Sequence, residues 1–490
     1  MTSIRFEQAQ SPRTDRVCRV CGQSRSKHVL TLAPAPIDGG KLELFGCLGC
    51  GSYFYGGADP VLGYDDAGFE PKYWMHYAQI GAGIPAMLSP LFALGERARG
   101  ALLDVGCGFG FVADFWGRSG RGTAVGLESA VYGEVGRDLL GVEVRPEYFS
   151  QCTAIAGRKF DIVFSSEVIE HVTDPTAFLK EISQGLAEAG ILVITTPSAT
   201  IVAPTSDPAT LLAALSPGYH YNLLSKAALQ TAFKAAGLPH VYVHDAGHQL
   251  VAWGSRQPFP RPERARFDWD AYFAYLQHLS ENGDPSVKGG ALYRMLKDYH
   301  GQGMQDRAGV ALRRLSAFAA DHYGIDLMQP EIGAALQSAD LMSRIDQSPA
   351  WLGCALVHAG QHVGQASADH RAKLRILDAA LRLFRRDIAT SPRYTPEPSF
   401  LLPLAEQQYR IALADALGAE LKAGMGAHVA EGATAPRPNH INDFVGAVGL
   451  LAGRIAAAMP AAAGQVARGT VSRWNRSVRK RLNANAAKAS

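Results

Sequence analysis

The chain has 490 residues, 47% hydrophobic and 19% charged, and no apolar run approaches the roughly 18–20 residues that a membrane-spanning helix needs. Its polar start, MTSIRFEQAQ, lacks the apolar stretch of a secretion signal, so we expect a cytoplasmic protein. The net charge of +3 is smaller than the basic charge between Arg468 and Lys488, so the rest of the chain is weakly acidic and an extended nucleic-acid-binding surface is not expected.

Two cysteine pairs mark the first predicted unit, residues 16–56. Cys18 and Cys21 form one C-x2-C pair and Cys47 and Cys50 the other, and a glycine follows each pair. Four thiolates complete the tetrahedral shell that zinc prefers and leave no position open for substrate, so we predict a structural zinc ion. An iron site and a redox-active dithiol are the alternatives. The segment has too few large apolar residues to fold on its own core.

Residues 57–99 form a predicted connector with a cap helix, and residues 100–256 show the pattern of an α/β fold. Short apolar runs alternate there with helical patterns, which is typical of a parallel sheet with helical crossovers. We predict strands at 101–105, 123–128, 142–145, 160–165 and 191–196, followed by an antiparallel pair near 239–243 and 248–253. Asp174 with Pro175, and Ser225, are predicted to start two of the helices.

A glycine-rich loop follows the first of these strands. Gly106, Gly108 and Gly110 occupy alternate positions, which differs from the G-x-G-x-x-G spacing of a dinucleotide site. Asp104 stands just before them, where its charge would repel a pyrophosphate and favour a cationic ligand. Glu128 ends the next strand, where a carboxylate can accept both hydroxyls of an adenosine ribose.

The segments DVGCGFG, VGLE, FDIVFSSEVIEHVTDP and ILVITTP, in this order, resemble the motifs of class I S-adenosylmethionine-dependent methyltransferases. The resemblance covers residues 100–256 and implies a Rossmann-like sheet of seven strands. It also implies that the three glycines line the cofactor, that Asp104 lies near its methionine end, that Glu128 binds its ribose and that Glu167 lies beside the sulfonium.

Three further candidates, Glu167, Glu170 and His171, follow the fourth strand. A base is needed there when a hydroxyl oxygen accepts the methyl group, and His171 beside Glu170 is the first candidate. His220 in SPGYHYNLLS is the second, although that segment could be a packed aromatic turn. The E-x-x-E-H pattern is similar to ubiquinone-biosynthesis O-methyltransferases, which implies that Glu167, Glu170 and His171 could ligate a divalent metal. Alternatively, His171 orients a loop or contacts the acceptor.

A cysteine-pair module ahead of this type of domain resembles bacterial enzymes that modify sugars, including deoxysugar C-methyltransferases and enzymes of polysaccharide or glycolipid assembly. The resemblance implies a saccharide or glycolipid acceptor. Because the C-terminal third reads as helical rather than α/β, we favour O-methylation. The alternatives are a sugar C-methyltransferase, an RNA methyltransferase and a non-catalytic scaffold that binds S-adenosylmethionine.

The rest of the chain is predicted to be helical. Three prolines in 254–266 indicate a linker, and apolar residues at 3,4,3,4 spacing from Leu374 to Ile388 predict an amphipathic helix within a helical domain over 265–440. Residues 441–490 combine an apolar segment, Phe444–Met459, with a basic tail, which suits peripheral contact with an anionic inner membrane surface. The alternative is a packed final helix with a disordered tail.

Overall fold

The computed structural model describes residues 3–7, 13–33, 40–56, 72–81, 83–263, 267–367, 369–391 and 395–430. Two of the regions named above, most of the connector at 57–71 and the amphipathic segment and basic tail at 441–490, lie outside these residues. Met1–Ala412 form one unit; in the other, Leu413–Ser490, only the end of one helix is described. None of the described helices is both long and apolar enough to cross a membrane.

The larger sheet confirms the predicted α/β fold class. Its seven strands, in spatial order, are β12 (His240–Asp245), β13 (Gln249–Ser255), β10 (Leu186–Pro197), β9 (Phe160–Ser166), β6 (Leu102–Val105), β7 (Ala124–Leu127) and β8 (Val144–Arg145). β13 runs antiparallel to both of its neighbours, and the strands from β10 to β8 are parallel. The chain fills the β6–β8 side first and then returns to β9, so the topological switch point lies between β6 and β9.

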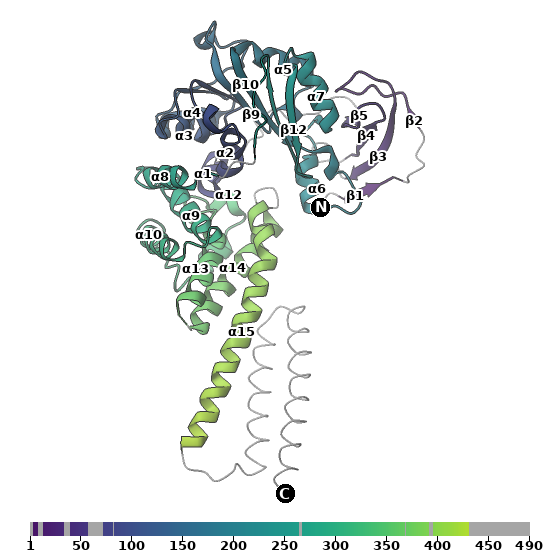
Figure 1. Ribbon diagram of the computed structural model, residues 1–490. Coiled ribbons are helices and arrows are strands. Elements are labelled where there is room, and N and C mark those ends of the chain that lie inside the picture. Colours follow the sequence, from purple (N-terminus) through teal and green to yellow (C-terminus); the bar gives the residue numbers. More distant parts are fainter. Residues whose placement is uncertain are drawn as a thin grey trace. The chain divides into compact units, whose positions relative to one another are not determined.

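Helices cover both faces of this sheet, as Figure 1 shows. Residues of one parity, including Leu102, Phe164 and Val193, face the core that also contains α2 (Ile84–Phe92), α3 (Phe111–Arg118) and α4 (Val131–Leu140). Residues of the other parity, including Leu103 and Val163, pack against α5 (Pro175–Ile182) and α7 (Lys226–Ala235). The side chains of Asp174 and Ser225 cap the last two helices, as predicted.

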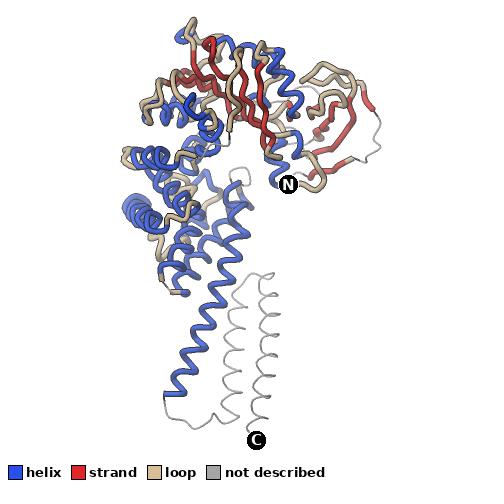
Figure 2. The backbone as a smooth tube through the Cα atoms, in the orientation of Figure 1, coloured by secondary structure: helices blue, strands red, loops and turns tan. Residues whose placement is uncertain are grey.

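The cysteine pairs lie at turns of a second, smaller sheet, drawn as a separate group of strands in Figure 2. Its strands, in spatial order, are β1 (Ser3–Phe6), β3 (Ser26–Ala33), β4 (Leu42–Cys47), β5 (Tyr53–Gly56) and β11 (Asn222–Leu223), and β2 (Arg13–Thr14) pairs with β3. β11 comes from the segment that precedes α7. A shared apolar cluster joins Leu30 and Leu44 of the small sheet to Leu215 at the end of α6 (Pro208–Leu215).

The segment after β13 is helical. The helices are α8 (Trp269–Leu279), α9 (Pro285–Gly301), α10 (Gln305–Tyr323), α11 (Gly333–Gln337), α12 (Leu341–Arg344), α13 (Leu352–Ala366), α14 (His370–Thr390) and α15 (Pro396–Ala430). The predicted amphipathic stripe lies in α14, where Leu377, Leu381 and Phe384 are buried. One continuous apolar cluster runs from the α3 side of the large sheet into α9, α13 and α14. The helical region and that face of the sheet therefore share a core.

Candidate active site and metal centre

The four paired cysteines converge at one point in the small sheet. The sulfur atoms of Cys18 and Cys50 lie 3.7 Å apart, and those of Cys21 and Cys47 lie 3.6 Å apart. A tetrahedral zinc ion with bonds of about 2.3 Å places its sulfur ligands roughly 3.8 Å from one another, so the cluster fits zinc. The backbone amides of Gly49 and Cys50 also point to the Cys47 sulfur, at 3.3 and 3.4 Å.

The glycine after each cysteine pair has a structural reason. Gly22 and Gly51 adopt left-handed backbone conformations, with φ of +70° and +74°. Their amides donate to the carbonyls of Cys18 and Cys47, which closes each turn around its pair of sulfur atoms. Non-glycine residues rarely adopt this conformation, so the C-x2-C-G spacing encodes the knuckle geometry itself.

The turn that carries Cys47 and Cys50 is hydrogen-bonded to the segment that leads from α6 to α7. Ser225 donates its hydroxyl to the carbonyl of Cys50 at 2.5 Å, and its amide donates to the Ser52 hydroxyl at 3.0 Å. β11 pairs antiparallel with β5 next to these bonds. Tyr55 donates to the Leu215 carbonyl from the other side. This connection could not be predicted from the sequence, because β11 is only two residues long.

The glycine-rich loop lies at the carboxyl end of β6, on one side of the switch point. Glu128, at the end of β7, accepts hydrogen bonds from the amides of Gly108 and Ala130 at 2.9 and 3.0 Å. A carboxylate oxygen can accept more than one hydrogen bond, so this arrangement orients Glu128 and leaves lone pairs for a ribose. Gly106 faces Val168 so closely that a side chain at 106 would overlap it, at 2.4 Å.

Asp104 is buried beside this loop, with 2% of its surface exposed. Burial, and then the nearby charge of Glu128, raise the pKa of Asp104 to about 8. Among the described residues, no arginine, lysine or histidine contributes to the pKa of Asp104. A ligand that brings a positive charge next to Asp104 would therefore restore its ionised form.

Two tyrosines that we did not single out from the sequence also line the loop. A side chain at Gly108 would lie 3.0 Å from the hydroxyl oxygen of Tyr77 and 3.6 Å from the ring of Tyr132. Tyr77 belongs to α1 (Tyr73–Ile80) and Tyr132 to α4, and their ring centroids are 5.9 Å apart. The spacing of Tyr73 and Tyr77, one helical turn apart just ahead of the first parallel strand, could have indicated Tyr77, whereas no comparable signal marks Tyr132.

Glu167 follows β9 and lies on the other side of the switch point. Its φ of 56° places it in a left-handed conformation that is unfavourable for a residue with a side chain, a feature that occurs often at functional sites. Its carboxylate accepts hydrogen bonds from Thr195 at 2.9 Å and from Gln249 at 3.0 Å. Burial raises the pKa of Glu167.

Glu170, His171 and His220 form a cluster close to Glu167. One ligand atom from each of these three residues lies within 4.8 Å of the other two. The two imidazole rings are 4.5 Å apart and nearly perpendicular, and Nε2 of His220 lies 3.9 Å from Oε1 of Glu170. The set differs from the Glu167, Glu170 and His171 expected from the E-x-x-E-H pattern, because Glu167 turns towards Thr195 and Gln249 while the loop before β11 supplies His220.

Backbone carbonyls orient both histidines. Nδ1 of His171 lies 2.9 Å from the Tyr219 carbonyl, and Nδ1 of His220 lies 2.8 Å from that of Ala214. Carbonyl oxygens only accept, so in the neutral rings both Nδ1 atoms carry the proton and both Nε2 atoms are unprotonated acceptors. Burial lowers the pKa of His171 to about 4 and that of His220 to about 3. Both rings are therefore neutral near pH 7.

Glu170 provides the acidic member of the cluster. It is fully buried, its Oε2 accepts from Thr196 at 2.9 Å, and its Oε1 has no hydrogen-bond partner among the described residues. Burial, reinforced by Glu167, raises the pKa of Glu170 well above its usual range. A carboxylate oxygen that has no hydrogen-bond partner among the described residues and lies 3.9 Å from Nε2 of His220 fits either a proton or a divalent cation.

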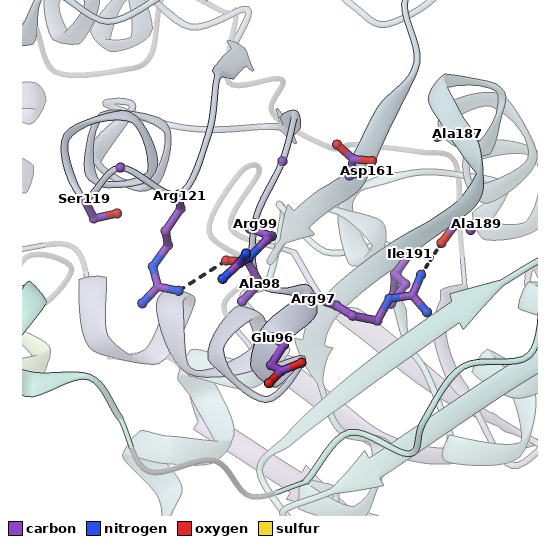
Figure 3. Close-up of a pocket in the computed structure, with 12 residues that line it drawn as sticks. Glu96, Arg97, Ala98, Arg99, Ser119, Arg121, Asp161, Ala187, Ala189 and Ile191 are labelled. Carbon is purple, nitrogen blue, oxygen red and sulfur yellow. Dashed lines mark hydrogen bonds between the residues drawn. The ribbon is translucent and has the colours of Figure 1, made fainter.

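A separate pocket of about 900 Å³ lies near the amino ends of the parallel strands, opposite the carboxyl ends that carry the glycine-rich loop (Figure 3). Arg97, Arg99, Arg121 and Asp161 are among its lining residues. Figure 3 shows that Arg97 and Arg121 turn to backbone carbonyls, those of Ala189 and Ala98. This pocket is remote from the glycine-rich loop and from the histidine cluster, so it does not belong to the candidate active site.

Comparison with known proteins agrees with this geometry. Residues 76–243 match the family model described as a methyltransferase domain. The ubiquinone biosynthesis O-methyltransferase of Parvibaculum lavamentivorans is 34% identical over 109 residues, which are 21% of this chain and 42% of that protein. The enzyme of the same name from Caulobacter sp. is 33% identical over 108 residues, covering 21% and 42%. The chain thus spans less than half the length of these curated relatives.

Among solved structures, an O-methyltransferase family protein from Burkholderia thailandensis is similar to 38% of this chain, over 59% of its own length. Its sequence identity is 14% and its TM-score is 0.32.

Proposed function

We propose that this chain transfers the methyl group of S-adenosylmethionine to a hydroxyl oxygen of a saccharide or glycolipid acceptor, because residues 76–243 match the family model of a methyltransferase domain. The observation that carries the proposal is the meeting of two groups at the switch point between β6 and β9. The glycine-rich loop with Glu128 lies on one side, and Glu170 with two neutral histidines lies on the other. Ligands of open α/β sheets bind at this position.

The cofactor would be bound by residues in and directly after two neighbouring strands, β6 and β7. Asp104 would face its positively charged methionine end, which would supply the positive charge that no described residue contributes to this buried carboxylate. Glu128 would accept the ribose hydroxyls while it continues to hold the loop amides. The three glycines would let the backbone approach the cofactor closely.

The transfer itself is an in-line displacement. The acceptor oxygen forms a bond to the methyl carbon, the carbon–sulfur bond breaks, and the electron pair returns to sulfur to give neutral S-adenosylhomocysteine. The hydroxyl proton must leave, and Nε2 of His171 is the proposed base because Nδ1 faces the Tyr219 carbonyl. His220 is the alternative base, with the same orientation by Ala214. Correct placement of the acceptor supplies much of the rate.

The cluster could also hold a divalent cation. Oε1 of Glu170 and Nε2 of His171 and His220 would be its protein ligands, and burial keeps both imidazoles in the neutral form that binds metals. When bound, the cation would lower the pKa of an acceptor hydroxyl. In the small sheet, the four cysteines would hold a structural zinc ion.

Two observations support a saccharide acceptor. The cysteine module ahead of the domain resembles bacterial sugar-modifying enzymes, and it packs against the same segment that carries His220.

The second candidate acceptor is a hydroxyl group of a ubiquinone precursor. The curated relatives are ubiquinone biosynthesis O-methyltransferases, and the matched part of each is about 40% of its length.

Titration calorimetry with S-adenosylmethionine tests the first part of the proposal. We expect one site per chain in the wild type, and binding weakened at least tenfold in Asp104→Ala and in Glu128→Ala. An acceptor panel of nucleotide sugars, glycolipids and ubiquinone precursors then tests the second part, by methyl transfer from labelled cofactor. Absence of cofactor binding to the folded protein would contradict the proposed function. Cofactor binding without transfer to any acceptor of the panel would favour the non-catalytic scaffold that binds S-adenosylmethionine.

A further inference from the structure

α1 lies between the cofactor loop and the helical region. On one side, the hydroxyl of Tyr77 reaches the loop next to Gly108, and its ring stacks 6.1 Å from that of Phe111. Tyr73 contacts Tyr132 with ring centroids 6.1 Å apart. A cofactor held by Gly108 and Glu128 would therefore lie beside these α1 tyrosines.

The other side of α1 is fixed to the helical region by Gln79. Gln79 is fully buried, and both ends of its amide are used. Its Oε1 accepts from the amide of Ala350 at 2.6 Å, and its Nε2 donates to the carbonyl of Ile345 at 3.5 Å. Met75 and Ile80, also on α1, pack against the apolar cluster around Ile345.

Arg294 of α9 forms the second attachment. It is 1% exposed, and its Nη2 donates to the carbonyl of Ala78 at 2.5 Å. Its guanidinium also lies 4.9 Å from the centroid of Phe111, which begins α3 directly after the glycine-rich loop. A side chain at Gly290 would lie 2.2 Å from the Ala78 carbonyl, so glycine there permits the close approach of α9 to α1. Arg294 thus contacts both α1 and the start of α3.

We propose that Gln79 and Arg294 are positioning residues that hold α1 over the cofactor loop, so that the helical region determines how long the cofactor stays bound. An isolated helix of eight residues is unstable in water, so the position of α1 depends on such contacts. Release of a cofactor from the Gly108 side requires Tyr77 to move away, and Gln79 and Arg294 resist that movement. The inference rests on the proposed function and gives the helical region a role in it.

The test measures the dissociation rate of S-adenosylhomocysteine from the full-length chain by stopped-flow displacement. We expect Gln79→Met and Arg294→Met each to release it at least tenfold faster than the wild type. Leu377→Ala is the matched control, because Leu377 is fully buried in α14 against Gly360 of α13 and so weakens the helical region away from α1. We expect the control to release the ligand within twofold of the wild-type rate.

Hydrogen exchange of residues 73–80 in the same variants gives a second readout, and it should be faster in Gln79→Met than in Leu377→Ala. If Arg294→Met does not fold, Gln79→Met still decides the question. Wild-type release rates in Gln79→Met, or equal acceleration in the Leu377 control, would overturn the inference alone. A wild-type chain that binds no S-adenosylhomocysteine would overturn the proposed function and the inference with it.

Discussion

The amide of Gly108 donates a hydrogen bond of 2.9 Å to the carboxylate of Glu128, which comes from the neighbouring strand. The central glycine of the loop and the proposed ribose ligand are thus parts of one structure. The other oxygen of this carboxylate accepts from the amide of Ala130. A change at Glu128 should therefore alter the loop as well as the contact with the ribose.

Glu128→Gln should weaken S-adenosylhomocysteine binding by about 2 kcal/mol, or roughly thirtyfold, because the amide nitrogen would face a backbone N–H that needs an acceptor. Titration calorimetry measures this change. Glu134→Gln, at an exposed acid of α4, is the control and should bind normally. A Glu128→Gln variant with wild-type affinity would refute the proposed role of the carboxylate.

Binding of S-adenosylhomocysteine should release close to one proton at pH 7. The pKa of Asp104 is about 8 in the ligand-free protein, so the carboxyl is mostly protonated at pH 7, and a cationic amino group beside it would favour the ionised form. As the pH increases towards 8, the affinity for S-adenosylhomocysteine should accordingly rise by up to about tenfold per pH unit. Calorimetry in two buffers of different ionisation enthalpy counts the proton. Asp104→Asn should abolish the release, and a wild type that releases no proton would contradict the assignment.

Cys47→Ser should lose the bound zinc and lower the melting temperature, because a structural zinc site contributes directly to folding. Elemental analysis and thermal unfolding measure the two effects. Cys152→Ser is the control, since Cys152 is buried in the α/β core and outside the four-cysteine cluster. Full zinc occupancy in Cys47→Ser would show that the cluster does not hold the ion as proposed.

Acid should destabilise the protein partly through the buried histidines. The pKa of His220 is about 3 when folded, below its ordinary value near 6.5, so between these values the unfolded chain binds the proton and stability falls as pH decreases. The expected loss is on the order of 2 kcal/mol for His220 between pH 7 and pH 5. Buried carboxyls with raised pKa values act in the opposite direction, so the comparison must be made between variants.

Urea unfolding at pH 7 and pH 5 tests this contribution. His220→Gln should lose about 2 kcal/mol less than the wild type between the two pH values. His244→Gln, at an exposed position of β12, should keep the wild-type pH dependence. Equal losses in His220→Gln and the wild type would indicate that His220 is solvated or already charged.

Local patterns predicted the large sheet well. Buried parallel strands such as β10 show as apolar runs, and Asp174 and Ser225 mark helix starts by their own hydrogen bonds. The four cysteines were predictable for the same reason, because the spacing within each pair is a local property. Asp104 and Glu128 could be expected to lie close together, because they stand at the ends of neighbouring strands.

Features that depend on distant contacts were not predictable. The left-handed backbone of Glu167 turns its carboxylate to Thr195, and nothing in E-x-x-E-H indicates that. His220 joins Glu170 because the Tyr221 amide donates to the Glu170 carbonyl across the fold. The attachment of α1 through Gln79 likewise joins positions more than 260 residues apart in the sequence.

The pairing of β5 with β11 also limits how this architecture can be rearranged. The cysteine module precedes the methyltransferase domain in the sequence, as a transferable cassette would, yet its sheet is completed by Asn222 and Leu223 from within that domain. A graft of residues 1–56 onto another methyltransferase would leave β5 as an open edge unless the segment from Leu215 to Ser225 were moved with it. Recombination of this chain should therefore succeed only when both segments are exchanged together.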